Sequence, residues 1–137
     1  MSDLFQDPAK LAAAIAIVVT GWTVTALIGG RFVAWIVRPY QDAALPQGLA
    51  GGGHKIGLLE RTLILLLILA GEPGGVGFLI AAKSILRFDV ASKGADDPQT
   101  TQKISEYIII GTLASFTWAF ATGFLTAEIL EIARQWP

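Results

Sequence analysis

Two apolar stretches dominate this sequence, residues 11–30 and 108–127, and each holds 20 residues without an ionisable side chain. At about 1.5 Å of rise per residue, a helix of that length matches the roughly 30 Å hydrocarbon core of a bilayer. The chain is 53% hydrophobic and only 15% charged, whereas about a quarter of the residues in an average soluble domain are charged. We therefore predict an all-α integral membrane protein.

Charge and cysteine content exclude several other classes of protein. The formal net charge is −1, the chain has no Cys, and it has a single His. A basic nucleic-acid-binding surface, a thiolate site and a multi-histidine metal centre are therefore not expected. We expect no cofactor, no metal, no nucleic-acid partner and no enzymatic activity.

Breaks in the apolar pattern divide what we expect to be a single membrane domain over residues 1–137. Pro8 suits the first turn of a helix, the Arg38-Pro39 pair disfavours continuation of one, and residues 51–53 are three glycines that indicate a flexible linker. The predicted segments are an N-terminal segment 1–10, a transmembrane helix 11–37, a loop 38–55, a helical hairpin 56–88, a loop 89–103 and a transmembrane helix 104–134.

The middle region, residues 56–88, allows two arrangements. Aliphatic residues 62–70 and apolar residues 76–82 are separated by the sequence Gly-Glu-Pro-Gly-Gly at 71–75, and neither run is long enough to cross a bilayer. In one arrangement a single crossing helix is broken at Glu72 and Pro73. In the other, the chain turns at residues 73–75 and returns to the side from which it entered, as a re-entrant or short spanning hairpin.

The distribution of Lys and Arg favours the hairpin. A single broken crossing divides the ten basic residues five against five, whereas the hairpin divides them eight against two. The eight are Arg31, Arg38, Lys55, Arg61, Lys83, Arg87, Lys93 and Lys103, and the two are Lys10 and Arg134. Because basic residues collect on the cytoplasmic side, we predict a multi-pass protein of the bacterial inner membrane with both termini outside the cytoplasm.

Charged residues in the hairpin need partners or water. A charge at membrane depth costs about 2.5–3.5 kcal/mol on insertion scales unless it is paired. Folding the chain at residues 73–75 brings Glu60 close to Lys83 or Arg87, so an ion pair at the mouth of the hairpin is expected. The alternative is that Glu60, Arg61, Lys83 and Arg87 are all solvated at the level of the headgroups.

Small residues recur at helical spacing in the last helix. Gly111 and Ser115 are four residues apart, as are Gly123 and Ala127. Such steps allow close approach of helix backbones in lipid, and we expect these residues to mediate helix packing and self-association.

Three segments follow one another in a specific order: GHKIGLLER at 53–61, GFLIAAKSILRF at 77–88 and EYIIIGTLAS at 106–115. This order resembles the carboxy-terminal hydrophobic module of a bacterial membrane-protein family of unknown function. The resemblance covers residues 53–127, and Val76 stands where the pattern has Ile. It implies a bacterial source and a membrane architecture, and it carries no activity.

Several residues are candidates for a functional role. Glu72 at the hairpin tip is a candidate cation or proton site, or it simply reaches an interface. Glu60, Lys83, Arg87 and Glu106 are expected to link the hairpin to the last helix rather than to carry chemistry. His54 is interpreted as a loop or helix-cap residue, and Ser84 and Ser115 lack a His partner suitably placed for nucleophilic catalysis.

The sequence therefore predicts a non-catalytic membrane protein with a structural or assembly role. Its expected partners are membrane lipid and either further copies of itself or the subunits of a larger membrane complex. The alternative is a homo-oligomeric channel or transporter whose hairpins line a path, with Glu60, Arg61, Glu72, Lys83, Ser84, Arg87 and Glu106 as its candidate residues.

Overall fold

The computed structural model describes residues 7–41, 51–93 and 98–135, and residues 86–93, 98, 100 and 101 through the backbone alone. The described part consists of helices, with a turn at residues 70–74, and contains no strand. The helices are α2 (Pro8–Trp22), η1 (Thr23–Ile28), α3 (Gly29–Val37), η2 (Arg38–Tyr40), α4 (Gly52–Leu69), α5 (Gly75–Lys93) and α6 (Pro98–Gln135). The predicted all-α fold is confirmed.

Two helical segments are long and apolar enough to cross a membrane. They are Pro8–Tyr40, which runs from α2 through η2, and Gln102–Gln135 within α6. Asp7 begins the first of them, because its carboxylate accepts hydrogen bonds from the backbone N–H groups of Ala9 and Lys10 at 2.9 and 3.4 Å and so satisfies donors that have no partner within the helix.

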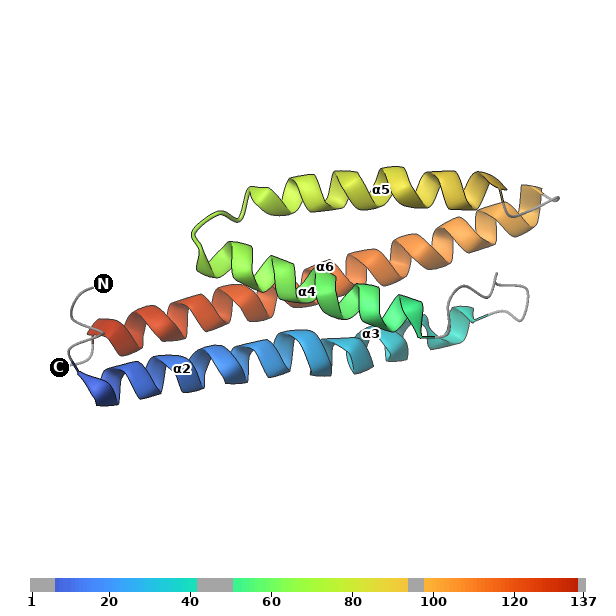
Figure 1. The fold of residues 1–137 in the computed structure, drawn as a ribbon. Coiled ribbons are helices and arrows are strands. Elements are labelled where there is room, and N and C mark those ends of the chain that lie inside the picture. Colours follow the sequence, from blue (N-terminus) through green and yellow to red (C-terminus); the bar gives the residue numbers. More distant parts are fainter. Residues whose placement is uncertain (1–6, 42–50, 94–97, 136–137) are drawn as a thin grey trace.

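Helices α4 and α5, which follow the first long segment and precede the second in the chain, form an antiparallel hairpin (Figure 1). The turn follows from the geometry at the end of α4: Gly71 has a φ of +77°, and the N–H groups of Gly71 and Glu72 donate to the carbonyls of Ile68 and Leu67. This is the Schellman pattern, in which a left-handed residue ends a helix and reverses the chain. The structure thus has the predicted hairpin and not a single broken helix.

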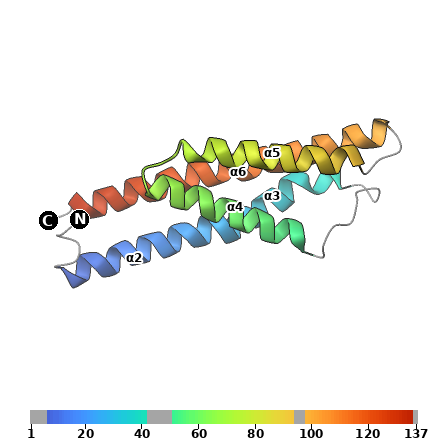
Figure 2. The ribbon, with the colours of Figure 1, turned by 45° about the horizontal axis from the view of Figure 1, so that its top comes forward.

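Helix α4 lies at the centre of the bundle, against η1, α3, α5 and α6. Helix α5 lies over α4 and α6 in both views (Figures 1 and 2). The two described ends of the chain lie together at one end of the bundle, and the hairpin turn lies short of that end. The core contains Ile64 and Ile68 from α4, Val76 from α5, and Phe116 and Ala119 from α6.

The two expected loops are shorter than predicted. Helix α5 continues to Lys93 and α6 begins at Pro98, so most of the predicted loop 89–103 is helical. Polar residues mark a segment that contacts water, but they do not end a helix. In the predicted loop 38–55, Gly52 and Gly53 belong to the first turn of α4, and of the three glycines at 51–53 only Gly51 adopts a left-handed φ, of +71°.

The outer surface of the bundle is apolar. Many large hydrophobic side chains on the long helices and on the hairpin are exposed, including Trp35, Leu63, Phe78, Leu113 and Ile132. A soluble protein rarely exposes contiguous apolar patches of more than a few hundred Å². This surface agrees with the two apolar spans in indicating a membrane protein.

Candidate functional site

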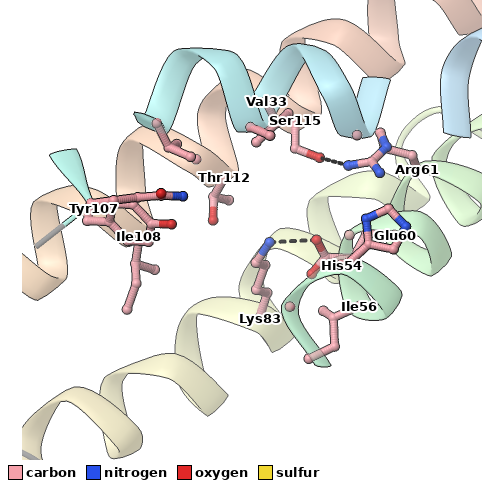
Figure 3. Close-up of a pocket in the computed structure, with 17 residues that line it drawn as sticks. Val33, His54, Ile56, Glu60, Arg61, Lys83, Tyr107, Ile108, Thr112 and Ser115 are labelled. Atoms are coloured by element: carbon pink, nitrogen blue, oxygen red, sulfur yellow. Dashed lines mark hydrogen bonds and ion pairs between the residues drawn. The ribbon is translucent and has the colours of Figure 1, made fainter. Parts of the chain in front are cut away.

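A cavity of about 310 Å³ lies between α3, α4 and α6, near the end of α3 and the start of α4, where Val37, Gly53 and His54 line it. Lys83 is the residue of α5 that lines it. Figure 3 shows Glu60, Arg61 and Lys83 together at the cavity, with Ser115 and Thr112 of α6 opposite them. His54, from the first turn of α4, and Tyr107, from α6, also line the cavity.

Arg61 is the most buried charged residue that the structure describes, with 3% of its surface exposed. Its Nε and Nη2 donate to the carbonyl oxygen of Ala26 at 3.2 and 3.0 Å, and its Nη1 donates to Ser115 Oγ at 3.1 Å. The side chain therefore joins α4 to η1 and to α6. Among the side chains that the structure describes, no carboxylate forms an ion pair with this guanidinium.

The carbonyl that binds Arg61 belongs to a stretch of π-helix, η1, which interrupts the first long helix. Within η1 the backbone bonds join residues five apart, as when Gly29 N–H donates to the Val24 carbonyl. Trp118 Nε1 also donates to Val24 at 3.1 Å, so side chains of α4 and α6 both bind this irregular backbone.

Close packing of glycine brings the helices near enough for these bonds. A Cβ atom at Gly29 would lie 2.5 Å from Trp118 Cδ1 and 3.0 Å from Arg61 Cδ. No real Cβ sits so close to its neighbours, so α3 approaches α4 and α6 here only because residue 29 has no side chain. The π-helix and this glycine contact are features that the sequence reasoning missed. The one available signal was Arg61 itself, a cation in an apolar helix that needed acceptors from elsewhere.

Glu60 and Lys83 form the ion pair that the hairpin was expected to contain. Lys83 Nζ donates to Glu60 Oε2 at 2.6 Å, and the two side chains are only 10% and 13% exposed. Lys83 Nζ also lies 5.2 Å from the centre of the Phe116 ring, within the range of a cation–π contact. Lys83 thus joins α5 both to α4 and to α6.

The other predicted site residues do not join this cluster. Glu72 is exposed at the hairpin turn, Ser84 is exposed and donates to Ile80 of its own helix, and Glu106 accepts from Gln102 one turn before it in α6. The expectation that Glu106 links the hairpin to the last helix stays a prediction, whereas the bond between Arg61 and Ser115 does join the hairpin to α6. The side chain of Arg87 lies outside the described residues. His54 is helical and exposed, in the first turn of α4.

The small residues of α6 pack within the chain. A Cβ atom at Gly123 would lie 2.7 Å from Ile68 Cδ1, and one at Gly111 would lie 3.3 Å from Val37 Cγ1. Ser115 binds Arg61, and Ala127 packs against the core cluster. These steps mediate helix packing inside the bundle, so they no longer argue for self-association.

The charged side chains at the cavity, Glu60, Arg61 and Lys83, are held by hydrogen bonds and by one ion pair within the protein. In the part of the chain that the structure describes, no group of three or more His, Cys, Asp or Glu side chains could hold a metal ion. Every buried side-chain nitrogen and oxygen that is described has a hydrogen-bond partner. Comparison with known protein families, curated proteins and solved structures finds no match to this chain, and the family resemblance drawn from the sequence stays a prediction.

Proposed function

We propose that the chain is a non-catalytic integral membrane protein of the bacterial inner membrane, with a structural or assembly role. In this proposal the two long helices cross the bilayer, the hairpin enters from the cytoplasmic side, and the protein acts as an oligomer or as a subunit of a larger complex. One observation carries the proposal: the buried polar groups join helices to one another. Arg61 connects α4 to η1 and α6, and the Glu60–Lys83 pair connects α4 to α5.

The remaining polar contacts between helices have the same character. Trp22 Nε1 donates to Thr62 Oγ1 at 3.0 Å, and Thr25 Oγ1 donates to Thr122 Oγ1 at 2.9 Å. A hydrogen bond between helices in lipid contributes about 0.6 kcal/mol on average, and about 1.7 kcal/mol at most, to the stability of the bundle. Several such bonds together favour one fixed arrangement of the helices, as a protein with a structural or assembly role requires.

The mass of the native particle tests the assembly role. The protein would be extracted from its membrane in polymer discs, and the particle mass measured with any co-purifying proteins identified. A small whole number of 14.5 kDa chains, or a larger particle with stoichiometric foreign subunits, is the expected result. A single chain without partners would contradict the proposal.

A second function, passage of a solute or ion, is supported by the polar cavity beside the hairpin. If the hairpins of several chains lined a path, liposomes that contain the purified protein would conduct. Glu72→Gln would then change the flux, because this carboxylate is exposed at the hairpin turn. A purely structural protein gives no flux above that of protein-free liposomes.

A further inference from the structure

The cavity at Arg61 has a positive charge that the protein does not neutralise by contact. Glu60 binds Lys83 at 2.6 Å, whereas Arg61 binds two neutral acceptors, a carbonyl and a hydroxyl. A guanidinium has five N–H groups, and the bonds to Ala26 and Ser115 use three of them. Two donors remain on a cation that is nine-tenths buried.

The remaining donors border the cavity at two glycines. A Cβ atom at Gly57 would lie 3.1 Å from Nη1, and one at Gly30 would lie 3.1 Å from Nη2. Both glycines line the cavity together with Arg61. A larger residue at either position would cover the edge of the guanidinium, so these two glycines leave it accessible from the cavity.

Charge along the whole molecule favours an anion at this site. Among the described residues, the end of the bundle at which α3 ends and α4 begins carries eight basic and three acidic residues, and the opposite end, counted with the hairpin turn, carries two basic and four acidic. The cavity, which Val37, Gly53 and His54 help to line, therefore lies toward the more positive end of the molecule. Such a field raises the local concentration of anions.

We propose that this cavity binds a phosphate group, carried either by a lipid headgroup or by a small soluble phosphate. A guanidinium matches phosphate geometry through paired N–H donors. Thr112, Tyr107 and His54 approach the same cavity from α6 and α4, and the oxygens of a tetrahedral phosphate accept from several directions, whereas those of a carboxylate lie in one plane. A volume of about 310 Å³ is at the lower limit of ligand pockets and suits a headgroup rather than a whole lipid.

The binding test uses the full-length protein, delipidated in a neutral detergent. Its thermal unfolding would be followed during titration with inorganic phosphate, and separately with a short-chain phosphatidylglycerol, each against sodium chloride at matched ionic strength. Stabilisation by inorganic phosphate identifies a soluble phosphate site, and stabilisation by the lipid alone identifies a headgroup site. No stabilisation by either overturns the proposal.

Variants separate the site from a general effect of charge. Arg61→Gln should weaken binding by about tenfold or more, because a bond to a charged group is lost. Arg134→Gln makes the same change in the last turn of α6, outside the residues that line the cavity, and should leave binding unchanged. If Arg61→Gln does not fold, Gly30→Val decides: it narrows the cavity at Nη2 and should reduce binding similarly. Gly77→Val is its control, because a Cβ atom at Gly77 meets nothing within 4 Å. Binding of wild-type strength in Gly30→Val or in folded Arg61→Gln overturns the proposal.

This inference is independent of the assembly role. A particle of a single chain would contradict the assembly role and leave phosphate binding intact. A stable oligomer that does not bind phosphate would contradict phosphate binding and leave the assembly role intact.

Discussion

Arg61 shows how one residue can define the interior of a small helical bundle. A buried charge costs several kcal/mol unless hydrogen bonds compensate for the lost water. Here the compensation comes from a backbone carbonyl in a π-helical stretch and from the hydroxyl of Ser115. The cation and the irregular helix are therefore joined directly: the Ala26 carbonyl that Arg61 binds and the Val24 carbonyl that Trp118 binds both belong to η1.

Because Ser115 accepts a hydrogen bond from Arg61, we predict that Ser115→Ala destabilises the protein. The substitution removes the Nη1 acceptor from a buried guanidinium, and the expected loss in the free energy of unfolding is about 1–2 kcal/mol. Equilibrium unfolding in mixed micelles measures it. Ser84→Ala is the matched control, because Ser84 is exposed and bonds only to its own helix. Equal effects of the two variants would argue against the Arg61 bond as a contribution to stability.

The helical hairpin owes its shape to features at its tip and along its length. Gly71 permits the reversal, and the Glu60–Lys83 pair fixes which faces of α4 and α5 meet. Gly123 then allows α6 to approach the same α4 face at Ile68. Each of these features sets the position of one helix relative to another, so none of them could be recognised from a single helix.

Gly71→Ala should destabilise the hairpin by about 1–2 kcal/mol, because an L-residue at positive φ brings its Cβ too close to the backbone. Gly77→Ala, in an ordinary helical position with open space beside it, should instead be neutral or stabilise the protein by up to about 1 kcal/mol. Thermal unfolding of the two single variants gives the comparison. A Gly71→Ala protein as stable as Gly77→Ala would show that the turn does not need its left-handed residue.

Gly123→Leu should destabilise the monomer rather than dissociate an oligomer. The new side chain overlaps Ile68, and overpacking of this kind costs about 1–3 kcal/mol. Unfolding and particle mass would be measured together, with Gly77→Leu as the control on an open surface. A variant of wild-type stability whose particle has lost chains would contradict this expectation and place Gly123 against a partner.

For the whole molecule, Figure 1 shows the start of α2 and the end of α6 at one end of the bundle, and the end of α3 and the start of α4, which flank the first loop, at the other. The two long segments run in opposite directions, and the hairpin starts and finishes at the loop end. The larger share of basic residues lies at that end, in agreement with a cytoplasmic location for the loops.

Single-cysteine labelling tests this orientation, and the natural chain has no Cys to interfere. Introduced cysteines at Lys55 and Lys103 should react with a membrane-impermeant reagent only after the cytoplasmic side is exposed. A cysteine at Gln135 should react in intact spheroplasts. A cysteine at Glu72 reports depth: reaction from the outside indicates a hairpin that spans, and reaction from neither side indicates one that stops within the bilayer. Labelling of positions 55 and 135 from the same side would refute the orientation.

Much of this fold follows from local patterns in the sequence. The apolar runs, Pro8 and residues 71–75 predict the two long helices and the hairpin between them, because length, hydropathy and turn chemistry act over a few residues at a time. The loop boundaries were predicted less well. Residues 89–93 and 98–103 are largely polar yet helical, since a polar side chain does not by itself interrupt the backbone hydrogen bonds of a helix.

The sequence by itself determined the helical class, the presence of the two apolar spans and the expectation that Glu60 would meet a cation of the second hairpin helix. Only the tertiary structure decided that Lys83 is that cation, that Arg61 binds Ala26 and Ser115, and that the small residues of α6 face α4 and α3. The physical reason is distance along the chain. Arg61 and Ala26 are 35 residues apart and Arg61 and Ser115 are 54 apart, so the contacts that build the cavity depend on how whole helices pack.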